Sequence, residues 1–330
     1  PLTIGLGVIL AYLETRYYVT RKPVFAIACQ FWTKIFVLNF AIGVSSGIVM
    51  EFQFGTNWAT YSRFVGDVFG SALAAEGIFA FFLESGFLAI VAFGREKVSA
   101  GLYLFSMYMV ALGSIFSSIW IVVANSWQQT PAGHHIVDIL RPVTGADGSR
   151  EMVPWIVDGV VQRRAEIVDF MAMVFNPSTV PRLSHVLLGC AAVGGFFVLS
   201  ISAYYILKDK HHEFARHSFN GALIFSLAAS LGLAINGHSQ AQNVYRNQPA
   251  KLAAFEGHYT TGRADLNLIG WPNEKEERID YEISLPGGLS FMVFDDFTFS
   301  KPVVGLDRFK PEDRPPLLVP FFSWRLMVGF

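Results

Sequence analysis

Long apolar stretches alternate with shorter polar connections along most of the chain. A membrane-spanning helix needs about 20 mainly apolar residues, and the pattern predicts six such spans and the start of a seventh. The predicted spans are Pro1–Tyr18, Ile35–Phe54, Val68–Phe93, Leu102–Trp127, Leu183–Leu207 and Phe219–Ile235, with the seventh starting near Leu317. We therefore expect an all-α fold, a polytopic transmembrane helix bundle.

The connections between the spans alternate in character. Those after the first, third and fifth spans contain the basic sequences TRYYVTRK, GREK and KDKHHEFARH. Basic loops stay in the cytoplasm, so the other connections are predicted on the outer face. One of them, Trp127–Arg182, is of mixed polarity and predicts an amphipathic helix around IVDGVVQRRAEIVDFMAMVF. The other, Gly237–Pro316, has 12 acidic and 9 basic residues, and loops of such length are usually functional or disordered.

Composition agrees with a membrane protein. Of the 330 residues, 52% are hydrophobic and 15% are charged, against roughly 25% charged in soluble domains. A net charge of −1 gives no reason to expect nucleic acid, and the two cysteines suggest no disulfide framework. The chain lacks an initiator methionine and closes on FFSWRLMVGF, about half of a span. We expect a fragment lacking both ends.

Two carboxylates, Glu76 and Glu84, stand inside the third predicted span, in the stretch EGIFAFFLES. An ionised group at mid-membrane costs at least a few kcal/mol, so such acids normally face a protein interior or a water-filled path. On an ideal helix the two residues are about 12 Å and roughly 80° apart, and they line one side of a path without touching. The pattern favours a functional role over a carboxylate that snorkels to an interface. This role could be a proton path, a metal partner or a heme partner, and spacing alone does not choose among them.

The fourth predicted span carries hydroxyl and amide groups at Ser114, Ser117, Ser118 and Asn125. Small polar residues commonly join transmembrane helices, and for the serines this structural interpretation is at least as good as a functional one. Asn125, one helix away from the carboxylates, is harder to explain by packing.

His185 lies just inside the outer end of the fifth predicted span, in RLSHVLLGCAAVGGFF. The small residues that follow it let a flat macrocycle or another helix approach closely. A lone histidine is more often structural than a ligand, but Met327 near the same face offers an opposite axial ligand. Histidine and methionine together hold low-spin hemes of raised potential, although any methionine can also be core filler.

The outer connection contains QPAKLAAFEGHY, with Lys251 and Glu256 five residues apart. Such charges usually form a solvated face. Beside a heme on the outer side they could instead bind and deprotonate a quinol.

Several motifs, taken together and in this order, resemble subunit I of the cytochrome bd quinol oxidases, and the resemblance covers essentially all 330 residues. The motifs are MEFQFGTNW, AFFLES, VALGS with WIVVANSWQQTP, LSH, KLAAFEG and WRLMVG. The resemblance implies that His185 and Met327 are the axial ligands of the low-spin heme b, and that Arg325 sits beside that heme.

The same resemblance assigns the remaining residues. Lys251 and Glu256 match the quinol-site pair, and Glu76 and Glu84 match carboxylates near a high-spin heme b and heme d. Two further residues match polar positions of the proton route: Ser117 and Asn125. The family's heme-ligating histidine of the first helix and its GRQPW-type motif with a heme-ligating glutamate are expected outside this sequence.

The resemblance also implies the organisation and the activity. Residues 1–330 form a single membrane domain, and residues 237–316 form its outer-face quinol-binding loop (the Q-loop), of the short variety. Electrons pass from quinol through low-spin heme b to high-spin heme b and heme d, where O2 is reduced to water and a membrane potential is generated. Subunit II of the oxidase is the expected partner, with room for a small single-span subunit. The expected location is the bacterial or archaeal cytoplasmic membrane.

Two other functions fit parts of the pattern. A proton-coupled transporter would also use intramembrane carboxylates and a long outer loop. A quinol-linked b-type cytochrome that does not reduce O2 would share the quinol and heme residues.

Overall fold

The computed structural model describes residues 1–144 and 149–329, and these are mostly helical. Contacts divide the chain into two compact units, Pro1–Leu233 and Ala234–Phe330. The division falls inside one long helix, α8 (His212–Asn247). Each unit has its own apolar core, so we describe each one by itself.

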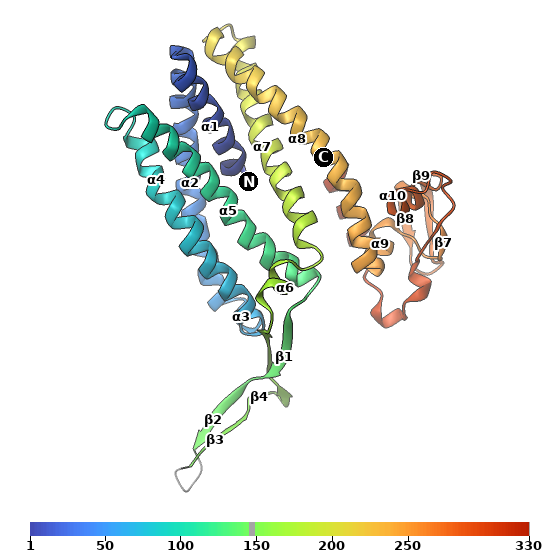
Figure 1. The fold of residues 1–330 in the computed structure, drawn as a ribbon. Coiled ribbons are helices and arrows are strands. Elements are labelled where there is room, and N and C mark those ends of the chain that lie inside the picture. Colours follow the sequence, from blue (N-terminus) through green and yellow to red (C-terminus); the bar gives the residue numbers. More distant parts are fainter. Residues whose placement is uncertain (145–148, 330) are drawn as a thin grey trace. The chain divides into compact units, whose positions relative to one another are not determined.

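The first unit is a bundle of long helices (Figure 1). Its helices, besides the first part of α8, are α1 (Leu2–Thr20), α2 (Pro23–Gly55), α3 (Ala59–Glu76), α4 (Phe82–Phe93), α5 (Ala100–Gln129) and α7 (Thr179–Leu207). Apart from Pro1, all six predicted spans fall on helical residues, and the third runs from α3 into α4. Four helices in the described part of the chain are long and apolar enough to cross a membrane: α2, α5, α7 and α8.

Helix α1 packs against α2, α5 and α7 and forms the centre of this unit. It meets α7 at two glycines, Gly5 and Gly194. No larger residue fits there, since a Cβ built at Gly194 would stand 2.5 Å from the carbonyl carbon of Gly5. Small residues at such points let helix backbones approach closely. The core of this unit contains large buried side chains such as Trp32, whose indole nitrogen donates to Ser218 Oγ at 3.1 Å.

The third predicted span is interrupted by a π-helical turn, η1 (Gly77–Phe81), which joins α3 to α4. At its end the backbone N–H of Phe82 donates to Gly77 O, five residues back. Such turns are rare and occur frequently at functional sites. This one separates Glu76 from Glu84, so the 80° offset expected for a regular α-helix does not hold.

The predicted amphipathic helix between Trp127 and Arg182 is wrong for most of its length. The segment forms six strands and one short helix: β1 (His134–Asp138), β2 (Leu140–Thr144), β3 (Arg150–Pro154), β4 (Ile156–Val157), β5 (Val160–Val161), β6 (Arg163–Ile167) and α6 (Phe170–Val174). Its strands pair antiparallel, β1 with β6, β2 with β3 and β4 with β5. Asp158 and Gly159 have φ of 49° and 77°, and such an Asp-Gly pair between β-branched residues favours a tight hairpin.

In the second unit, most of the segment predicted as the outer connection, residues 237–316, is folded. The unit begins with the last part of helix α8. The further elements are α9 (Pro249–Glu256), β7 (Gly262–Arg263), β8 (Leu266–Asn273), β9 (Arg278–Leu285), α10 (Gly288–Phe294), β10 (Pro302–Val303), η2 (Leu306–Arg308), η3 (Pro311–Asp313) and α11 (Leu318–Gly329). Strands β8 and β9 form an antiparallel hairpin, and β10 pairs with β7. Buried apolar side chains hold these pieces together: Leu252, Leu289, Val303 and Leu306.

An ion pair inside the first unit was not predicted from the sequence. Glu14, on α1, is 2% exposed, and its Oε2 accepts a hydrogen bond at 3.0 Å from Nη1 of Arg95, in the connection after α4. The guanidinium also lies over the rings of Tyr17 and Tyr103. Because Arg95 belongs to the basic GREK sequence, the loop pattern indicated only a cytoplasmic connection.

Breaking this pair is expected to destabilise the first unit. Glu14→Gln leaves a mostly buried guanidinium without its counter-charge, and removing one partner of a buried pair costs about 3–5 kcal/mol. The midpoint of thermal unfolding of the purified protein should therefore fall clearly. Glu96→Gln, at an exposed neighbouring position, is the matched control and should leave the midpoint unchanged. Equal midpoints in the two variants would contradict a stabilising role for the pair.

Candidate functional site

Glu84 is buried where α4 packs beside α5 (Figure 1). The helices are close because residue 113 is glycine, and a Cβ built there would stand 2.8 Å from the Cβ of Glu84. The next residue on α5, Ser114, donates a hydrogen bond from its Oγ to Glu84 Oε1. A carboxyl group surrounded by apolar helices thus has the hydrogen-bond partner that burial requires.

Glu76 has a similar partner. It ends α3, directly before the π-helical turn, and its Oε1 accepts a hydrogen bond from Ser117 Oγ at 2.7 Å. Ser114 and Ser117 are three residues apart and so lie on one face of α5. The structure therefore connects both predicted carboxylates to one face of a single helix, and it adds Gly113 and Ser114 to the predicted site residues.

Asn125 lies apart from this cluster. It is eight residues beyond Ser117 on α5, about 12 Å along the helix axis, and its side chain is exposed. Its Oδ1 accepts a hydrogen bond from Nη2 of Arg182, near the start of α7. The sequence signal available for this contact was the basic residue Arg182, directly before the fifth predicted span.

In the second unit, Glu256 forms a buried ion pair with Arg325. Glu256 is the last residue of α9 and is 3% exposed. Arg325, on α11, places Nη2 3.5 Å from Glu256 Oε2 and donates hydrogen bonds to Phe255 O at 2.7 Å and Asn267 O at 2.6 Å. One arginine thus fastens α9, strand β8 and α11 together.

The environment of Glu256 changes its acidity. Burial raises the pKa of this carboxyl to about 7, although the Arg325 charge and a hydrogen bond with Trp324 act in the opposite direction. A carboxyl with a pKa near neutrality can both accept and release a proton under physiological conditions. Glu256 is therefore suited to act as a general base.

Lys251 lies on the same helix but on another side. Five residues turn an α-helix by about 140°, and Lys251 is exposed whereas Glu256 is buried. Its Nζ donates to Gln248 Oε1 at 3.3 Å. The predicted pair is thus one buried acid–base group and one accessible cation.

The two predicted axial ligands lie in different units, His185 on α7 and Met327 on α11. Both side chains are exposed, Met327 to 67%. One turn beyond His185, no heavy atom lies within 4 Å of a Cβ built at Gly189, which leaves space on that helix face for a flat group. No cluster of three or more metal-ligating side chains occurs among the described residues. His185 and Met327 thus supply one candidate ligand on each of two helices.

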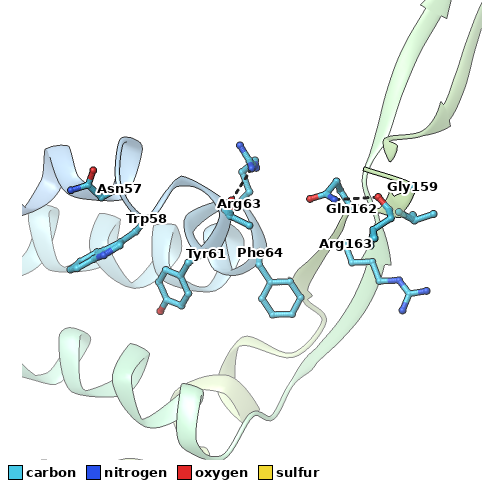
Figure 2. A pocket seen from close by; sticks show the side chains of 11 residues that line it. Asn57, Trp58, Tyr61, Arg63, Phe64, Gly159, Gln162 and Arg163 are labelled. Carbon is cyan, nitrogen blue, oxygen red and sulfur yellow. Dashed lines mark hydrogen bonds between the residues drawn. The ribbon is translucent and has the colours of Figure 1, made fainter. Parts of the chain in front are cut away.

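A pocket of about 980 Å³ lies in the first unit between the start of α3 and the β4–β5 hairpin. Figure 2 shows the lining residues on two sides, with Trp58, Tyr61 and Phe64 on the helical side and Gln162 and Arg163 on the hairpin side. None of the predicted site residues lines this pocket. The candidate site is therefore defined by the polar contacts described above.

Comparisons with known proteins agree with the motifs. The complete chain, residues 1–330, matches the family model described as cytochrome bd terminal oxidase subunit I. It is similar to cytochrome bd ubiquinol oxidase subunit 1 of Bacillus subtilis (strain 168), at 36% identity over 340 residues, which covers 100% of this chain and 67% of the relative. It is also similar to cytochrome bd-II ubiquinol oxidase subunit 1 of Escherichia coli (strain K12), at 36% identity, with 99% and 59% covered.

A solved structure extends the likeness to the fold. The bd oxidase from Geobacillus thermodenitrificans matches with a TM-score of 0.82 and 25% sequence identity, over 99% of this chain and 70% of the matched chain. This chain thus spans only part of the length of the relatives that it matches.

Proposed function

Because the chain belongs to the cytochrome bd terminal oxidase subunit I family, we propose that it is the heme-bearing, quinol-oxidising subunit of a terminal oxidase. In this proposal it takes electrons from a membrane quinol and passes them through low-spin heme b to high-spin heme b and heme d. Reduction of O2 to water there would generate a membrane potential.

The observation that carries the proposal is the ion pair between Glu256 and Arg325. It ties a buried carboxyl of near-neutral pKa to the helix on which the expected heme ligand Met327 lies, two residues further on. Oxidation of a quinol releases protons together with electrons. A base and one expected ligand of the electron-accepting heme in the same folded unit suit that reaction.

At the quinol site, Lys251 and Glu256 would act differently. The exposed ammonium of Lys251 would bind and orient an oxygen of the quinol head group. Glu256, as the carboxylate, would accept the quinol hydroxyl proton, and Arg325 would hold this carboxylate in place through its contacts with Phe255 O and Asn267 O.

His185 and Met327 would hold the low-spin heme b, with Arg325 nearby. When bound, this heme supplies reversible one-electron chemistry, at a potential that histidine and methionine ligation raises. The space at Gly189, one turn beyond His185, supports this assignment, since no heavy atom lies within 4 Å of a Cβ built there.

The carboxylates on the α3–α4 segment would serve the oxygen-reducing end. Glu76 and Glu84 would hold and pass protons, with Ser117 as hydrogen-bond partner of Glu76. Asn125 would belong to the same proton route further along α5. These roles give a physical reason for acids at membrane depth, because oxygen reduction consumes protons there.

Amide replacements check the proton role. Glu84→Gln keeps size and hydrogen bonding but cannot exchange a proton, so heme content should stay normal while proton-linked electron transfer slows. Glu76→Gln should in addition disturb the high-spin heme spectrum, because Glu76 matches a carboxylate nearest to that heme. Full oxidase activity of both variants would contradict the proton-path assignment, since packing alone tolerates a neutral amide.

The partner and the location complete the proposal. The names of the similar oxidases contain the term subunit 1, which implies at least one further subunit. We infer a second hydrophobic subunit, with room for a small single-span one. Four helices suited to cross a membrane place the chain in a membrane. We assign it to the bacterial or archaeal cytoplasmic membrane with the Q-loop on the outer face, from the basic character of the opposite connections.

A reduced-minus-oxidised spectrum of the full-length protein with its partner, recorded in membranes, tests this function together with quinol-driven O2 consumption. We expect bands of low-spin and high-spin hemes and O2 uptake that depends on quinol. Heme bands without O2 uptake would favour the quinol-linked b-type cytochrome. Absence of all heme bands would favour the proton-coupled transporter.

A further inference from the structure

Two serines on α5 use their hydroxyls differently from Ser106 and Ser118 of the same helix. Ser106 and Ser118 donate to carbonyls of their own helix, Leu102 O at 2.8 Å and Ile115 O at 2.7 Å. This is the usual behaviour of serine inside a helix. Ser114 and Ser117 instead donate across to carboxylates of the neighbouring helical segment.

The contact at Ser114 is held from two directions. The close approach of the two helices at Gly113 fixes the start of the Glu84 side chain. A Cβ built at Gly113 would stand 3.1 Å from the Cα and 2.8 Å from the Cβ of Glu84. The hydroxyl of Ser114 fixes the far end of the same side chain. A glutamate side chain has several staggered rotamers, and these two contacts select one of them.

We propose that Ser114 is a positioning residue for Glu84. Its hydroxyl holds the carboxyl group in the orientation from which the carboxyl exchanges protons, and Gly113 sets the helix spacing that makes this hydrogen bond possible. The proton stays on the Ser114 oxygen, so the serine orients the exchanging group and does not itself transfer a proton. This inference rests on the proposed function, in which Glu84 delivers protons for oxygen reduction.

Ser114→Ala in the complete oxidase tests the inference. A hydrogen bond to a carboxylate is among the stronger hydrogen bonds in proteins, and its loss should slow quinol-driven O2 consumption by about tenfold. The solvent deuterium isotope effect on turnover should rise, because the proton step becomes more limiting. Ser118→Ala is the matched control, since that buried hydroxyl bonds only within its own helix, and it should turn over at the parent rate.

A double variant separates positioning from packing. In the Glu84→Gln background no exchangeable carboxyl remains to be positioned, so adding Ser114→Ala should change the residual rate by less than about twofold. A packing defect would slow turnover by the same factor in both backgrounds. Equal factors, or parent-like turnover of Ser114→Ala, would overturn the inference.

A measurement of folding and a second variant keep the outcome clear. Heme content reports folding, and if Ser114→Ala loses heme, Ser114→Cys replaces it, because a thiol has nearly the same shape and is a weak donor. Ser114→Cys should then be slowed, and a parent-like rate would also overturn the inference. Failure of the proposed function is distinguishable, since the parent complex would then lack heme bands or quinol-driven O2 uptake.

Discussion

Replacement of His185 by alanine is expected to abolish the absorption signal of the low-spin heme. An imidazole that ligates iron has no substitute when the side chain ends at Cβ. Electrons from quinol should then no longer reach the oxygen-reducing hemes, and quinol-driven O2 uptake should be lost. A reduced-minus-oxidised spectrum of the variant in membranes measures the first effect directly.

Met327→Leu and His135→Ala make this result specific. A thioether ligand raises the potential of a heme, so Met327→Leu should retain a heme whose midpoint potential is lower. His135 is exposed on β1 and lies 3.3 Å from Glu166, far in sequence from the expected ligands, and its replacement should leave the spectrum unchanged. A normal spectrum and potential in both His185→Ala and Met327→Leu would show that the ligand assignment is wrong.

The helical segments and the family were predictable because both depend on strong local signals. Runs of about 20 apolar residues allow few structures other than a transmembrane helix, and apart from Pro1 all six predicted spans fall on helical residues. The family resemblance used motifs such as MEFQFGTNW and KLAAFEG, and the match over residues 1–330 confirms it. Helix ends were less predictable, since α8 runs to Asn247 through polar residues that hydropathy excludes.

The errors came from weak or competing signals. Between Trp127 and Arg182, spaced apolar residues suggested a helix, but the Asp158-Gly159 turn between valines selects a hairpin. The π-helical turn after Glu76 has no sequence signature that hydrophobic periodicity can reveal, and it changes how the two carboxylates are presented.

Partners of the site residues were visible only in three dimensions. The sequence showed Ser114 as one of several hydroxyls, and nothing in the spacing connected it with Glu84, 30 residues earlier. Likewise, the pairing of Glu14 with Arg95 joins residues that are 81 positions apart. Residue identities were therefore predictable, whereas their contacts depended on how the helices pack. The roles of the predicted site residues stay predictions that the variants test.

Glu256→Gln is expected to have the second large effect, and it should be confined to quinol. The amide keeps the shape of the side chain but cannot accept a proton, and a general base contributes about 10²–10⁴-fold to a rate. Quinol-driven O2 consumption should therefore fall by at least about 100-fold. O2 consumption with an artificial reductant that feeds the hemes directly should continue at the parent rate.

The pH dependence supplies the most specific part of this prediction. Because burial raises the pKa of Glu256 to about 7, the carboxyl is protonated and inactive as a base below that pH, and it is ionised and active above it. The quinol-driven rate of the parent oxidase should rise as the pH increases through about 7, and Glu256→Gln should lose this rise.

Glu274→Gln, at an exposed position of the same loop, should keep both the rate and the pH profile. Lys251→Gln should raise KM more than it lowers kcat, because Lys251 binds the quinol without accepting its proton. Equal loss of activity with both reductants in Glu256→Gln would instead place this carboxyl in the heme or proton machinery.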